Sequence, residues 1–143
     1  MAYLNRLASV PSAEVEALRT DLNFPVAASL TVFVSHLIAY WVQVQTLGKL
    51  LGQAIDGGAV LNSELRHQFR VPCYQEPQTV CQLNAQLAEA WQQAISVEPV
   101  PPDDWYRVEI EKVLRVFAHA ADRGECVVSA LEPCNDIHFV PNN

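Results

Sequence analysis

The feature that most constrains this chain is an uncharged run from Leu22 to Gly48, which contains no Asp, Glu, Lys or Arg. Three structures accommodate such a run: a membrane span, a buried helix of a folded domain, or a pocket wall around His36. A membrane-spanning helix needs about 20 consecutive apolar residues, so the run is long enough to be considered. Its flanks carry no clusters of Lys or Arg that would orient a span.

The spacing of side chains within the run favours a buried helix. Apolar residues recur at alternating steps of four and three, which is the repeat of one helical face: Leu30, Val34, Leu37, Trp41 and Val44. A second stripe carries polar groups that lipid would leave unpaired: Ser29, His36, Tyr40 and Gln43. The sequence therefore predicts a central, nearly all-round-buried helix and no membrane span.

Composition and charge narrow the class of protein. The chain has 143 residues, of which 50% are hydrophobic and 17% charged, which predicts one packed domain over residues 1–143. The formal net charge is −7 and the basic residues are scattered, so neither nucleic acid nor an anionic membrane surface is an expected partner. The amino-terminal segment lacks the features of a secretory signal, which predicts a cytoplasmic protein.

The four cysteines are expected to be reduced thiols in that compartment. The pairs Cys73/Cys81 and Cys126/Cys134 share one spacing, but seven intervening residues do not match the short intervals between zinc ligands. Only Cys134 and His138 have a metal-like interval. The sequence therefore predicts neither a metal site nor a cofactor.

Local signals predict the remaining elements. Apolar and polar side chains alternate over residues 2–10, as in a short strand. Ser12 is the expected N-cap of a first helix, and the Gly57-Gly58 pair marks a turn. Two further helices are expected, one from Pro77 to about Val97 and one capped by Asp103 and stopped by Gly124, with a strand after it. In the last helix the residues predicted to face inward are Tyr106, Ile110, Val113, Phe117 and Ala120. The fold class is α+β: a helix-rich single domain in which about four helices pack on a small sheet that includes both terminal strands.

Candidate site residues come from the uncharged run and from the loop-like segment between Ser63 and Pro77. On the helix, His36 is either a hydrogen-bonded core histidine or a pocket base with Tyr40 one turn on. The loop concentrates groups that bind anions or proteins. The predicted ligand-binding set is His36, Tyr40, Arg66, His67, Arg70 and Tyr74.

The order of features resembles a bacterial family, the YfbM-like domains. The resemblance rests on Gly57-Gly58, a loop reaching Tyr74, a helix opening at residues 77–80, Trp105 after a proline-bearing link, and the segment FAHAADRG at residues 117–124 before a strand. It covers roughly the last two-thirds of the chain. It implies a small α+β domain of unknown function and supplies no catalytic residue.

Two functions remain open from the sequence. The first is a non-enzymatic accessory module that binds another protein, since no catalytic constellation can be assembled and Trp and Tyr residues offer binding anchors. The second is a small-molecule or hydrolytic site for an anionic ligand, built from the predicted set above. The sequence does not indicate an oligomeric state.

Overall fold

Strand β1 (Leu4–Val10) is an interior strand of the molecule's main sheet, with a neighbour on each side. The computed structural model describes residues 4–21, 23–35, 38, 46–62, 71–132 and 137–140. Antiparallel pairing joins β1 to β3 (Leu30–Ser35) and to β6 (Cys126–Glu132). The five-stranded sheet has the order β3-β1-β6-β5-β4, in which β5 spans Cys73–Gln75 and β4 spans Ala59–Val60. The predicted strands near the two ends of the chain are therefore confirmed, and they pair directly.

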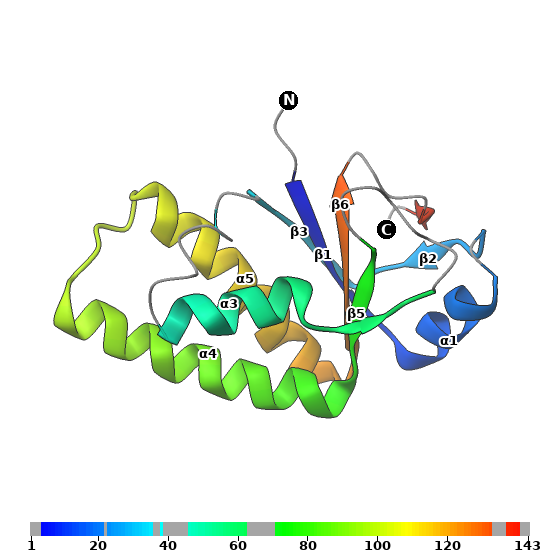
Figure 1. Ribbon diagram of the computed structural model, residues 1–143, viewed down its shortest axis with the longest axis horizontal. Helices are drawn as coiled ribbons and strands as arrows, with labels where there is room; N and C mark the ends of the chain where they lie inside the picture. The colour runs from blue at the N-terminus through cyan, green and yellow to red at the C-terminus, as the bar shows by residue number, and fades with distance from the viewer. Residues whose placement is uncertain are drawn as a thin grey trace.

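Three helices cover one face of this sheet: α3 (Thr46–Asp56), α4 (Pro77–Val97) and α5 (Trp105–Arg123) (Figure 1). Leu7 of β1 and Val127 of β6 point into this layer. Their partners from the helices include Leu51, Leu83 and Phe117, all fully buried. The helix predicted from Pro77 to about Val97 is confirmed, and its buried residues Val80, Leu83, Leu87 and Trp91 follow the 3.6-residue repeat of one helical face.

The opposite face carries helix α1 (Ser12–Thr20) and a two-stranded parallel sheet of β2 (Val26–Ala27) and β7 (Phe139–Val140) (Figure 1). A second core lies here, built from alternate residues of the same strands, such as Ala8 and Val128. Because successive side chains in a strand point to opposite faces, one sheet supplies both cores. The result is an α+β fold with four helices among the described residues.

The central helix predicted for the uncharged run is wrong at residues 30–35, which form β3. Val32 and Val34 are buried and Phe33 between them is exposed, so the local repeat is two residues. A short apolar run matches the 3.6-residue repeat of a helix as well as the two-residue repeat of a strand. β-branched and aromatic residues favour the strand once a partner strand is available. His36 and Tyr40 of the same run lie outside the described residues. Among the helices that the structure describes, none is long and apolar enough to cross a membrane.

Helix ends differ from the predictions by single residues. Asp104, not Asp103, is the N-cap of α5, and its carboxylate accepts a hydrogen bond from the Tyr106 amide at 2.9 Å. Ser12 is the first residue of α1 rather than its cap. Tyr106, predicted to face inward, is exposed because it lies in the first turn of α5, beyond the core. Gly124 ends the helix at φ 66°, as predicted.

The glycine turn after α3 is confirmed. A Cβ at Gly58 would lie 2.5 Å from the carbonyl oxygen of Tyr74, which a side chain cannot approach so closely. Glycine is therefore required where β4 passes β5. The residues Cys73–Gln75, expected to be loop, form the short strand β5 because they fill the position beside β6.

Candidate functional site

Tyr74 is the one residue of the predicted set that lies in the described part of the chain. The other five fall outside it: His36, Tyr40, Arg66, His67 and Arg70. Tyr74 is buried, with 6% exposure, and packs in the core under α1. The guanidinium carbon of Arg19 lies 5.3 Å from the centre of its ring. Tyr74 thus forms part of the wall between α1 and the sheet.

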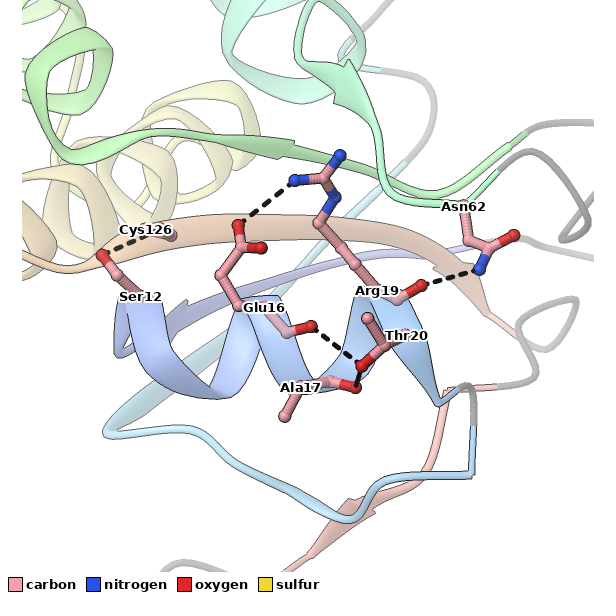
Figure 2. A network of polar contacts seen from close by, with 7 residues as sticks. All are labelled: Ser12, Glu16, Ala17, Arg19, Thr20, Asn62 and Cys126. Atoms are coloured by element: carbon pink, nitrogen blue, oxygen red, sulfur yellow. Dashed lines mark hydrogen bonds and ion pairs between the residues drawn. The ribbon is translucent and has the colours of Figure 1, made fainter.

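Polar contacts along α1 tie its carboxyl end to the end of β4 (Figure 2). Arg19 Nη1 lies 3.2 Å from Glu16 Oε1, and Asn62 Nδ2 donates to the Arg19 carbonyl at 2.9 Å. Thr20 donates to the Ala17 carbonyl one turn back. The ion pair is exposed, so it stabilises little. These contacts hold the helix in place and bring no reactive group to the surface.

Cys126 lies at the other end of the same helix, on a cavity of about 170 Å³. Its Sγ is 3.6 Å from the Ser12 hydroxyl (Figure 2). Burial is the largest influence and raises the pKa of this thiol; the Ser12 hydrogen bond lowers the pKa, and the carboxylates of Glu76, Glu16 and Glu125 each raise it to a lesser extent, so that the pKa is raised overall. Since the thiolate is the nucleophile, a thiol with a raised pKa is a poor one. The geometry does not support cysteine chemistry here.

A partly buried polar cluster joins three distant segments where β1, the β2–β3 connection and the end of α5 meet. Glu125 Oε1 accepts hydrogen bonds from Ser9 Oγ at 2.7 Å and Ser29 Oγ at 2.5 Å. Arg123 Nε lies 3.3 Å from the same oxygen. Ser29 Oγ is also 2.8 Å from His119 Nε2. A serine, a histidine and a carboxylate in contact raise the question of a hydrolase.

Which atom donates in each hydrogen bond decides whether this cluster can act as a hydrolase site. Burial alone would raise the pKa of Glu125, but hydrogen bonds from Ser29 and Ser9 and the charge of Arg123 together lower it. The carboxylate is therefore ionised near neutral pH and only accepts, so the single proton of the Ser29 hydroxyl goes to Glu125. His119 Nε2 must then donate to Ser29. A histidine base would have to accept that proton, so this cluster fastens the segments together instead.

Sequence reasoning missed this cluster because its members are far apart. Ser9 and Glu125 are separated by 116 residues, and no spacing rule connects them. The only signal in the sequence was a histidine, His119, near the end of the predicted last helix. The tertiary structure alone brings the five side chains together.

An exposed apolar surface lies at the end of the molecule where α4 passes into α5, on the left of Figure 1. We call it the helical tip and define it by Val97, Trp105, Tyr106 and Val108. Val97 is 86% exposed, Trp105 44% and Tyr106 41%. The two aromatic rings make an edge-to-face contact, with centres 4.9 Å apart.

The connection between the two helices is held in a defined shape. Asp104 N donates to the Pro101 carbonyl at 3.0 Å, and its side chain caps α5. Arg107 binds the Val100 carbonyl through Nη1 at 2.5 Å and pairs with Glu111. Prolines at 99, 101 and 102 restrict the backbone further. The tip is therefore presented on a fixed support.

Within the described ranges, no group of three or more His, Cys, Asp or Glu side chains is placed to hold a metal ion. Comparisons with protein-family models, with curated proteins and with solved structures find no match. The resemblance to YfbM-like domains thus stays a prediction.

Proposed function

We propose that the chain is a non-enzymatic protein-binding module that docks on its partner through the helical tip. The observation that carries the proposal is the exposure, side by side, of Trp105 and Tyr106. Trp and Tyr dominate the binding energy of protein interfaces, where a few central residues contribute most of the affinity. Val97 at the end of α4 and Val108 in the first turn of α5 are exposed as well.

The rigidity of the connection supports the same proposal. Binding costs free energy when loops and side chains must be ordered at the interface. Here Asp104 and Arg107 already fix the backbone between the helices. Binding therefore needs to order less of this connection, and the entropic cost of binding is smaller. Mutual ring contact restricts the two aromatic side chains in the same way.

We place this module in the cytoplasm. The support is that Cys73, Cys81 and Cys126, the cysteines in the described part of the chain, are free thiols. The acidic balance of the chain, −7 overall, favours a protein partner over nucleic acid.

A pull-down with tip variants tests the proposal. Tagged wild-type protein and the double variant Trp105→Ala/Tyr106→Ala are incubated with lysate of the source organism, and bound proteins are quantified by mass spectrometry. Loss of a hot-spot residue costs about 2 kcal/mol or more, so recovery of the partner should fall roughly 30-fold.

The matched control is Phe33→Ala, which removes another aromatic side chain of similar exposure, 40%, from the sheet. It should leave recovery unchanged. Equal recovery with wild type and the double variant, with both folded by circular dichroism, would refute docking through the tip.

A further inference from the structure

A groove of about 440 Å³ lies between edge strand β3 and strand β7, at the opposite side of the sheet from the three packed helices. Its walls include Ser29, Thr31, Phe33, Phe139 and Val140. Pockets for small molecules fall in this size range and combine mostly apolar walls with a few polar groups. The groove has no part in the helical tip, so what it binds is a separate question.

Arg6 is the only charged residue among those described that line this groove. It pairs across the sheet with Phe33 in the register of β1 and β3. Its guanidinium carbon lies 5.0 Å from the centre of the Phe33 ring and 4.4 Å from that of Phe139. The two rings hold the guanidinium in place, and such contacts stabilise a cation against an aromatic face.

The hydrogen bonds of Arg6 are incomplete. Nη2 pairs with Glu132 Oε1 at 2.8 Å. The buried Nε has no hydrogen-bond partner, and it is the one buried side-chain nitrogen or oxygen in the described residues without one. Buried donors in native proteins are nearly always satisfied by protein, water or a bound ion. An acceptor is therefore missing beside this guanidinium.

The ion pair with Glu132 does not close the site. Both side chains are partly exposed, and pairs of this kind stabilise the protein little. Arginine can bind a second oxyanion along the edge of its planar group. Glu132 already neutralises part of the charge of Arg6. A ligand with one negative charge therefore fits the groove better than a ligand with two.

We propose that this groove binds a small aromatic carboxylate. The carboxylate pairs with Arg6 and supplies the missing acceptor, while the ring packs against the exposed side of Phe33. Thr31, which lines the same groove, offers a hydroxyl that can donate to the second carboxylate oxygen. The planar guanidinium can form parallel hydrogen bonds to a carboxylate, and the single charge of this group suits a groove in which Arg6 is already paired with Glu132.

The test titrates ¹⁵N-labelled protein with benzoate and follows amide chemical shifts by NMR. Benzoate should shift the amides of Thr31, Phe33 and Val140 in a saturable way. Acetate, which lacks the ring, and benzyl alcohol, which lacks the charge, should each bind at least about tenfold more weakly, as should the dianion phenyl phosphate.

Arg6→Gln should weaken benzoate binding about tenfold or more, because a charged hydrogen bond is lost. The matched control is Arg19→Gln, since Arg19 also lies over an aromatic ring and pairs with a glutamate, but outside the groove. This variant should bind as wild type does. If Arg6→Gln does not fold, Thr31→Val tests the hydrogen bond to the second carboxylate oxygen and should weaken binding severalfold.

Three results would overturn the proposal: no saturable shifts with benzoate, shifts located away from the groove, or equal binding of benzoate and benzyl alcohol. A fourth result, equal affinity for benzoate and phenyl phosphate, would show that the groove binds oxyanions in general, and it would also reject the proposal as stated. None of these results bears on the helical tip.

Discussion

Glu125 shows how one buried carboxylate holds three segments of the chain together. It accepts from Ser9 at the end of β1 and from Ser29 before β3, and it follows the last residue of α5 by two positions. Its own amide closes the end of that helix by donating to the Ala120 carbonyl at 2.9 Å. Removing the carboxylate would take away the printed acceptor of the fully buried Ser9 hydroxyl and one charged hydrogen bond of Ser29, and an unsatisfied buried polar group costs about 1–3 kcal/mol.

We therefore expect Glu125→Ala to lower the free energy of unfolding by about 2–4 kcal/mol. The matched control is Glu111→Ala, which breaks an exposed ion pair with Arg107 and should cost less than about 1 kcal/mol. Urea denaturation of both variants measures the difference. Equal, small losses would mean that the cluster contributes no more than a surface pair.

The lowered pKa of Glu125 gives this stability a pH dependence. The folded pKa lies below that of the unfolded chain, so the contribution is complete above the unfolded value of about 4.3 and is lost as pH falls through the folded value. Wild type should therefore lose stability more steeply than Glu125→Gln on acidification below about pH 4. Unfolding midpoints measured across this range check it, and parallel curves for the two proteins would contradict it.

At the scale of the element, α5 has strong signals at both ends. Asp104 caps its first turn and Gly124 ends it in the left-handed region. Asp103, one residue earlier, is exposed and was the predicted cap. The two aspartates therefore form a natural pair for measuring the value of a cap.

Asp104→Ala should cost about 1 kcal/mol, because the Tyr106 amide loses its acceptor. Asp103→Ala should change the free energy of unfolding by less than about 0.5 kcal/mol. Thermal or urea unfolding distinguishes them. If Asp103→Ala lowered the free energy of unfolding more than Asp104→Ala does, Asp103 would be the N-cap, as the sequence predicted.

At the scale of the whole molecule, one sheet separates two cores. Leu83 of α4 belongs to the core under the three helices, and Leu18 of α1 to the core on the opposite face. Because β1 and β6 contribute side chains to both, neither core can lose its packing without disturbing the shared strands. The molecule is expected to unfold in one cooperative step.

Leu18→Ala and Leu83→Ala should each lower the free energy of unfolding by about 2–5 kcal/mol, since both side chains are fully buried. In each variant the urea transitions followed by far-UV circular dichroism and by fluorescence should coincide. A separate early transition in Leu18→Ala alone would show that the α1 side unfolds independently.

By itself, the sequence determined the elements whose signals are local. The helix from Pro77 to Val97 follows from a proline at its start and an unbroken 3.6-residue stripe, and α5 follows from its stripe and Gly124. The strands near the chain ends also follow from local pattern, and with them the α+β class. These signals are readable because each depends on neighbours a few residues away.

Only the tertiary structure decided the rest. Residues 30–35 suit a helix or a strand, and pairing with β1 makes them β3. Tyr74, expected on a binding loop, is buried because β5 lies beside β6. The Glu125 cluster and the Arg6 groove each join residues from three separate segments. The physical reason is that such contacts depend on how strands are ordered in the sheet, which no local repeat encodes.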